Sequence, residues 1–219
     1  MKINNLPNIS SFGAKKILPV TVQIRTKQNG SKPMRGHFCE IQPTNQEDVK
    51  IMMRILKNWK GKHSDDDFAR TIAGNFLYKD RSDVKYYGVA LDKKESDAYG
   101  NFCSLIQTTN PHSADKSNFE IYYIQSAPKI ISPRQGKKPP IGGAGANAIL
   151  GAVSIAEANG FEKVELLSCN DGFYKNIGFE KVPVKESKVR RCYGTVFRLP
   201  AQKFEEFKAK IKERYSSNS

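Results

Sequence analysis

The stretch that decides the fold is IGGAGANAILGAVSIAEANG, residues 141–160. It opens with Gly142, Gly143 and Gly145, whose lack of side chains lets several backbone N–H groups of a tight turn point to one place. The following residues predict an amphipathic helix that ends at Gly160, with the positive end of its dipole at the turn. Such a turn binds anions, most often a phosphate or diphosphate, although a plain strand-to-helix connector has the same pattern.

The composition is that of a globular protein with one large domain. The chain has 219 residues, of which 38% are hydrophobic and 26% are charged, so it is long enough to bury a sizeable core. No apolar run reaches the length that spans a bilayer, and the first 20 residues lack the apolar segment of a signal peptide. We therefore expect a soluble, cytoplasmic protein with no membrane partner.

The cysteines are too widely spaced to indicate a metal site. They are Cys39, Cys103, Cys169 and Cys192. No CxxC occurs, and none of the three histidines has metal-ligand spacing to a cysteine or to another histidine. We expect no metal, and we interpret the thiols as small, buried apolar side chains.

The charge is strongly positive and concentrated near the end of the chain. The net charge is +14, and residues 181–219 hold 11 Lys and Arg against 4 Asp and Glu, a net of +7. Such a balance favours an anionic partner: a nucleic acid, a membrane surface, an acidic protein or a phosphate-rich cofactor. The charge alone does not choose among them, and a solvated basic face has the same composition.

The hydrophobic periodicity predicts a mixed sheet with helices. Strand patterns occur at residues 17–25, 37–41, 86–92, 99–109, 118–126, 164–168, 179–182 and 190–200. Helical patterns occur at residues 45–59, from Ser64, after the glycine turn as far as Asn159-Gly160, within 170–182 before a stop at Gly178, and at 201–215. Thr44 and Glu47 form a capping box before the first helix, and Ser64 caps the second. We expect the first two strands to form a hairpin and the next three an antiparallel meander. The strand–helix–strand run through the glycine turn implies parallel pairing.

Three motifs occur in a fixed order around the glycine turn. The first is EIYYIQSAP (Glu120–Pro128), the second is GAGA (Gly143–Ala146), and the third is FYKNIGF (Phe173–Phe179). Together they resemble the GNAT superfamily of acyl-CoA-dependent N-acetyltransferases. The resemblance covers about residues 37–198.

The resemblance implies an α/β (α+β) fold with a mixed, mainly antiparallel sheet. Two central parallel strands would splay apart in a V, and helices would cover both faces. From the residues themselves we expect 1–16 to be a loose N-terminal segment and 17–219 to form a single domain. The basic C-terminal helix at 201–215 lies outside the resemblance and would be an addition to the family-like core.

Two departures from the family pattern concern the anion site and the strand after it. A longer connection, residues 129–142, separates the first motif from the second, and Pro140 stands where the family usually has Arg or Gln. Arg134, Lys137 and Lys138 could supply the missing positive charge, or could belong to a surface for a substrate or partner. The segment that follows Asn170 is shorter than the common family form, which leaves the role of Asn170 open.

By resemblance, acetyl-CoA is the co-substrate and binds in the V between strands 118–126 and 163–168. Backbone groups of Ile124 and Ser126 would pair with the pantetheine arm like a missing strand, and the N–H groups of the glycine turn would hold the diphosphate. The residues that we assign to this site are Ile124, Gln125, Ser126, Gly142, Gly143, Ala144, Gly145, Ala146, Asn147, Asn170 and Tyr174.

The implied mechanism is direct attack of an amine on the thioester in a ternary complex. Tyr174 falls at the position of the family's general acid, and a phenol with an ordinary pKa of about 10 is protonated at neutral pH; a packing role is the alternative. Strand alternation places residues 120, 122, 124 and 126 on one face, where Glu120 could act as a base through water or could simply lie on the surface. We interpret Cys169 as a buried thiol and not a nucleophile.

Three functions remain open from the sequence. The first is an N-acetyltransferase that acts on an amine of a small molecule, peptide or protein, as a monomer or homodimer. The second is a GNAT-like basic module without catalysis that binds an acidic partner or nucleic acid. Nucleic acid is disfavoured because the aromatic residues of the last helix have core spacing. A Rossmann-type nucleotide enzyme is disfavoured because the glycine turn follows a meander.

Overall fold

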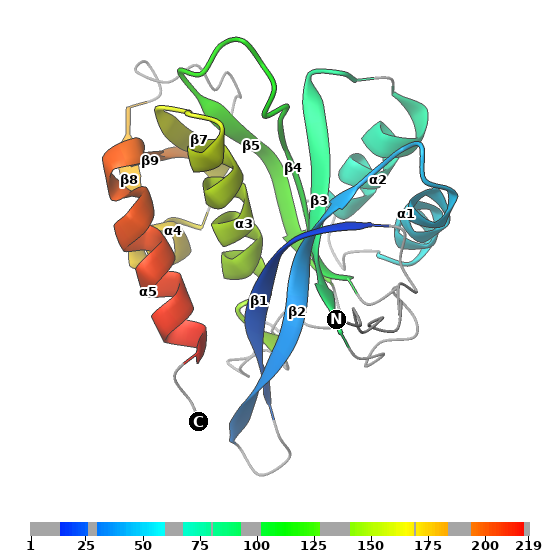
Figure 1. The fold of residues 1–219 in the computed structure, drawn as a ribbon, viewed down its shortest axis with the longest axis horizontal. Helices are drawn as coiled ribbons and strands as arrows, with labels where there is room; N and C mark the ends of the chain where they lie inside the picture. The colour runs from blue at the N-terminus through cyan, green and yellow to red at the C-terminus, as the bar shows by residue number, and fades with distance from the viewer. Residues whose placement is uncertain are drawn as a thin grey trace, which may run out of the picture.

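The computed structural model is built around one nine-stranded sheet (Figure 1). It describes residues 14–25, 30–59, 68–79, 81–92, 102–127, 141–168, 170–183 and 194–216. The strands are β1 (Lys15–Arg25), β2 (Ser31–Ile41), β3 (Val84–Leu91), β4 (Phe102–Thr109), β5 (Phe119–Ser126), β6 (Ile141–Gly142), β7 (Lys163–Ser168), β8 (Glu180–Val182) and β9 (Thr195–Pro200). Their order across the sheet is β6-β1-β2-β3-β4-β5-β7-β9-β8.

The strands pair as the sequence predicts. β1 and β2 form an antiparallel hairpin, and β3, β4 and β5 form an antiparallel meander. β5 and β7, which are joined through the glycine turn and its helix, pair in parallel. The other ladders in the described ranges are antiparallel. The prediction of a mixed, mainly antiparallel sheet is therefore confirmed.

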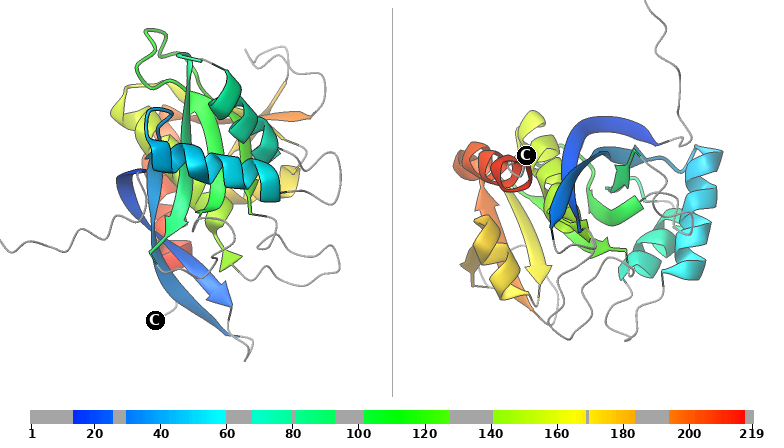
Figure 2. Two further views of the ribbon diagram at one scale, coloured as in Figure 1. Left: turned by 90° about the vertical axis from the view of Figure 1, so that its right-hand side faces the viewer. Right: turned by 90° about the horizontal axis from the view of Figure 1, so that it is seen from below.

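Helices cover both faces of this sheet (Figures 1 and 2). One face carries α1 (Gln46–Asn58) and α2 (Phe68–Tyr78), and the other carries α3 (Ala144–Ala158), α4 (Asp171–Ile177) and α5 (Phe204–Ser216). Each face has its own hydrophobic cluster, so the sheet is buried on both sides in its middle. No helix within the described ranges is long and apolar enough to cross a membrane.

The start of α1 differs from the predicted capping box. The N-cap is Asn45, whose side-chain oxygen accepts hydrogen bonds from the backbone N–H groups of Glu47 (2.9 Å) and Asp48 (3.3 Å). The prediction of Thr44 was therefore wrong by one position, because Asn and Thr are both good caps and the sequence does not rank them. The predicted cap at Ser64 lies outside the described residues.

Most of the segment that we expected to be loose, residues 1–13, also lies outside the described residues, as do the basic residues 129–140. The end of that segment is ordered, because β1 begins at Lys15. Lys15 pairs with Glu40 and Lys16 pairs with Cys39 across the β1–β2 ladder. The ladder with β2 thus extends the first strand two residues beyond the predicted boundary.

The helix after the glycine turn is apolar nearly all round, and not amphipathic as the sequence suggested. Eleven of the fifteen residues of α3 are buried. The reason is that α3 packs on the sheet and is flanked by α5 on one side and by β1 on the other (Figure 1). A helix enclosed on both sides has no polar face, and α5 carries the solvent-exposed charges instead.

We expect the fold to be less stable in alkaline solution, because two thiols are buried in its core. Cys39 and Cys103 are 3% and 2% exposed, as the sequence predicts for buried thiols. Burial raises the pKa of both from 9.0 to about 12, because a thiolate would lose its hydration. Between these values the folded chain holds protons that the unfolded chain releases. The free energy of unfolding should therefore fall as the pH rises from about 9 to about 12.

Urea unfolding at pH 7, 9 and 10.5 measures this effect. The double variant Cys39→Ala/Cys103→Ala is the control, because it keeps two small apolar side chains and removes both thiol titrations. Its free energy of unfolding should fall less steeply with pH than that of the wild type. Equal slopes for the two proteins would contradict the role of the thiols.

Candidate active site

The centre of the sheet opens into a V between β5 and β7. The parallel ladder joins only three residue pairs: Phe119 with Val164, Glu120 with Glu165, and Ile121 with Leu166. Beyond them β5 continues to Ser126 beside β4, and β7 continues to Ser168 beside β9. The backbone groups that face the gap beyond the last pair have no place in either ladder. They can therefore pair with an extended ligand inserted between the strands.

A β-bulge in β5 sets the direction of the side chains beside the V. The pairing with β4 runs from Gln107–Tyr123 to Thr108–Ile121, so Tyr122 is an extra residue on β5. As a result Tyr122 and Tyr123 both pack on the α1–α2 side, whereas Ile121 and Ile124 pack on the α3 side.

The prediction that residues 120, 122, 124 and 126 share one face was therefore wrong. Ser126 lies on the α3 side, because its Oγ is 3.6 Å from where a Cβ on Gly145 would stand. Gln125 points to the opposite side, and its side-chain oxygen accepts a hydrogen bond from the backbone N–H of Ala69 in α2 (2.5 Å). Gln125 can thus serve a ligand in the V only through its backbone.

The glycine turn lies at the open end of this V. Gly143 is the N-cap of α3 with φ of +87°, a conformation that favours glycine, and it offers no side chain to the first N–H groups of the helix. Gly145 brings the turn against Ser126 at the end of β5. Ser104 fastens it further, because its hydroxyl donates to the carbonyl of Ala144 (3.2 Å). The turn therefore has the geometry of a backbone anion site beside the end of the central strand.

Asn147 holds this turn in place. Its side-chain nitrogen donates to the carbonyl oxygens of Thr21 in β1 (2.7 Å) and Gly143 (3.0 Å), and its backbone N–H also donates to Gly143 (2.9 Å). The residue is 2% exposed. These contacts give Asn147 a structural role in the turn, and its side-chain donors are already engaged within the protein.

Tyr174 of α4 contacts the end of β7, the second strand of the V, through Ser168. Its ring is 5% exposed and stacks on Phe197 of β9 with centroids 5.3 Å apart. Its hydroxyl forms a hydrogen bond with the side chain of Ser168, the last residue of β7. Burial raises the pKa of Tyr174 to about 12, although the Ser168 hydrogen bond opposes this shift. The phenol is therefore a proton donor at every physiological pH.

Ser168 was missed by the sequence interpretation. Its Oγ also accepts a hydrogen bond from the backbone N–H of Asn170 (2.9 Å). Asn170 in turn caps α4, because its side-chain oxygen accepts from the N–H of Phe173 (3.2 Å). A polar residue at the end of a buried strand was the available signal. Cys169, between these two residues, lies outside the described residues.

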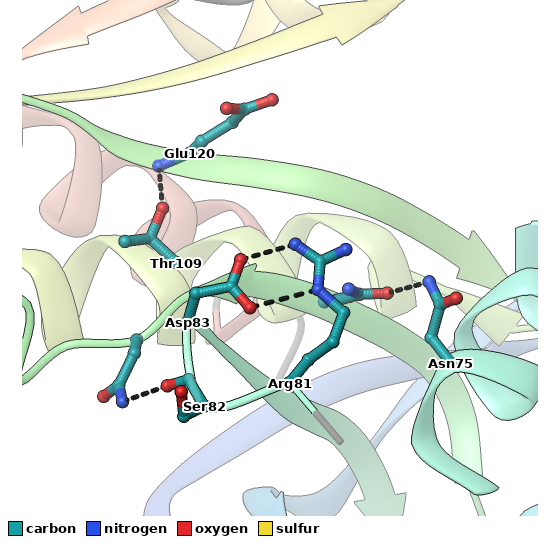
Figure 3. Close-up of polar contacts among 8 residues, drawn as sticks. Asn75, Arg81, Ser82, Asp83, Thr109 and Glu120 are labelled. Atoms are coloured by element: carbon teal, nitrogen blue, oxygen red, sulfur yellow. Dashed lines mark hydrogen bonds and ion pairs between the residues drawn. The ribbon is translucent and has the colours of Figure 1, made fainter. Parts of the chain in front are cut away.

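Glu120 lies at the closed end of the V, in the part of β5 that still pairs with β7. Its backbone N–H donates to the hydroxyl of Thr109 (3.0 Å), and Figure 3 shows its carboxylate directed away from the Arg81–Asp83 ion pair. Its neighbour across the ladder is Glu165, which is fully buried and pairs with Arg198 of β9 (2.7 Å). Glu120 is thus carried by β5, whereas Tyr174 lies in α4 and contacts the end of β7 through Ser168.

Comparison with solved structures identifies the architecture. GCN5 from Tetrahymena matches with a TM-score of 0.51 and 10% identity, over 75% of this chain and 95% of that protein. An acetyltransferase of the GNAT family from Staphylococcus aureus has a TM-score of 0.47 and 11% identity, over 76% and 99%. The chain has the fold of the GNAT acetyltransferases. No protein-family model matches this GNAT-like chain, and no curated protein matches its sequence significantly.

A third structure extends the likeness beyond the three motifs. An uncharacterized protein from Bacillus halodurans has a TM-score of 0.52 and 12% identity, over 92% of this chain and 100% of that protein. The motif-bearing region, about residues 37–198, is shorter than this coverage. The likeness to this structure therefore extends beyond the region of the three motifs.

Proposed function

We propose that the protein is an N-acetyltransferase that moves an acetyl group from acetyl-CoA to an amine. The observation that carries the proposal is the open V, with the glycine turn and the Tyr174 hydroxyl at the ends of its two strands. Each part matches one need of the reaction: backbone groups for an extended pantetheine arm, N–H groups for a diphosphate, and a proton donor for a thiolate.

In the proposed reaction the nitrogen of a neutral amine attacks the thioester carbonyl carbon. Backbone N–H groups of β5 beside Ile124 stabilise the oxyanion, and the C–S bond then breaks. Tyr174 donates its proton to the departing sulfur, which leaves as a thiol. Glu120 accepts the proton of the amine through water. No acyl-enzyme forms, so both substrates must be bound together.

Acetyl-CoA binding tests this proposal most directly. At a ligand concentration 100 times the dissociation constant, binding stabilises a folded protein by about 2.7 kcal/mol. We expect acetyl-CoA to raise the melting temperature by several degrees, with acetate as the control ligand. Release of free thiol with a panel of small amines, polyamines and peptides should then identify the acceptor class.

Two outcomes would contradict the proposed acetyltransferase activity. No thermal shift with millimolar acetyl-CoA would exclude the proposed co-substrate. A shift with no thiol release for any amine would favour the alternative, a GNAT-like basic module that binds an acidic partner without catalysis. The exposed basic residues of α5 are the feature that would serve such a module.

A further inference from the structure

The last turn of α5 packs directly against the glycine turn. A Cβ placed on Gly143 would lie 2.7–3.1 Å from three ring atoms of Tyr215, so the ring covers the Cα of the residue that begins the anion site. Figure 1 shows why the two meet: α5 lies beside α3 and runs in the opposite direction, so its C-terminal end is level with the start of α3.

Contacts fix the position of α5 both at its last turn and along its length. The side-chain nitrogen of Gln23 in β1 donates to the backbone carbonyl of Tyr215 (2.7 Å). On the side of α3, Lys208 pairs with Glu157 and with Glu205 of its own helix. Phe207 and Ile211 are buried in the α3-side cluster. The end of α5 is therefore a wall of the anion site.

This wall carries a positive charge. The guanidinium carbon of Arg214 lies 5.9 Å from the centre of the Tyr215 ring, a cation–π distance. Arg214 is exposed, and no ion pair with a carboxylate is found for it in the described part of the chain. By contrast, Pro139 and Pro140 directly precede Ile141, so the approach to the turn along the chain has no basic side chain at these positions.

We infer that Arg214, held by Tyr215, is a phosphate-binding residue of the acetyl-CoA site. Its guanidinium binds either the diphosphate at the glycine turn or the 3′-phosphate of the adenosine, since both are phosphate groups that prefer a forked donor. This inference rests on the proposed function. It goes beyond it because α5 lies outside the region that the three motifs define.

Titration calorimetry with CoA tests the inference in the full-length protein. Arg214→Gln should weaken CoA binding by about 10- to 100-fold at low salt, in the range of a charge-assisted hydrogen bond to phosphate. Lys212→Gln is the matched control, because it removes the same charge from the same exposed turn; its effect should stay within about 2-fold, the size of a screened surface charge. Arg214→Lys should restore part of the affinity.

Ligand fragments distinguish the two phosphate sources. If Arg214 binds the 3′-phosphate, Arg214→Gln should bind 3′-dephospho-CoA as well as the wild type does. If Arg214 binds the diphosphate, the loss should persist with 3′-dephospho-CoA. In acetyl transfer, Arg214→Gln should raise KM for acetyl-CoA and leave kcat unchanged, which a misfolded variant would not do.

The failures of the two proposals are distinguishable. If the wild type binds CoA and Arg214→Gln binds it equally well, this inference is wrong and the proposed function stands. If Arg214→Gln and Lys212→Gln weaken CoA binding equally, the loss reflects the general positive charge of the helix, and the inference about Arg214 is wrong. If the wild type does not bind CoA, the proposed function fails and this inference fails with it.

Discussion

Tyr174→Phe should lower kcat for acetyl transfer by roughly 100-fold or more, the usual contribution of a general acid. The hydroxyl beside Ser168 is the proposed proton donor, and its pKa of about 12 keeps it protonated at assay pH. Phe keeps the stacking on Phe197, so the fold should lose only the Ser168 hydrogen bond, about 1 kcal/mol. Steady-state kinetics at pH 8 measures the loss, and the affinity for acetyl-CoA should change little.

Ser168→Ala separates chemistry from structure in this experiment. It removes the same hydrogen bond and keeps the phenol, so it should retain most of the turnover that Tyr174→Phe loses. Equal losses in the two variants would mean that the hydrogen bond positions the strand end and that Tyr174 is not the acid. Wild-type turnover in Tyr174→Phe would exclude the acid role outright.

Gly151→Ala should destabilise the protein by about 1–3 kcal/mol, although alanine is the better helix former. A Cβ at this position in α3 would lie 2.3 Å from the ring of Phe38 in β2. That ring is fully buried and stacks on Tyr87 with centroids 5.2 Å apart, so it has no room to move. The helix must lift from the sheet instead, and the glycine turn at its start moves with it. Urea unfolding measures the stability change.

Gly74→Ala in α2 is the matched control. The substitution is the same and the residue also lies inside a helix, but nothing lies within 4 Å of the new Cβ. It should stabilise the protein by roughly 0.5–1 kcal/mol, the intrinsic preference of a helix for alanine. A Gly151→Ala variant as stable as Gly74→Ala would show that α3 does not pack on Phe38 in this way.

The strands and helices were predictable because their signals are local. The hairpin, the meander and α1 each repeat apolar residues at a period that belongs to one kind of structure. The β-bulge at Tyr122 was not predictable, because the apolar run IYYI at 121–124 has no period to interrupt. Its position depends on the pairing of Gln107 and Thr108 in the neighbouring strand. Side-chain directions after Tyr122 were therefore wrong, whereas the strand itself was correct.

Some residues of the candidate site also belong to local sequence patterns, whereas others are brought there by contacts between distant segments. The glycine turn and the motif that contains Tyr174 are short sequence patterns, and the structure brings them to the ends of the two strands of the V. Contacts from distant segments, such as those of Gln23 and Tyr215 at the turn, leave no pattern in the sequence. Arg214 could be seen only as one of many basic residues. The contact of its neighbour Tyr215 with the glycine turn follows from how α5 docks on α3.

Gln23 and Tyr215, which contact each other at the end of α5, are synthesised at very different times. The two residues are 192 positions apart. At about 5–20 residues per second, a ribosome needs roughly 10–40 s to pass from one to the other. During that time one edge of β1 stays unpaired until β6 is made, and the glycine turn has no contact with α5. The nascent chain therefore completes the surroundings of the glycine turn only when translation has reached Tyr215, long after the central strands have been made.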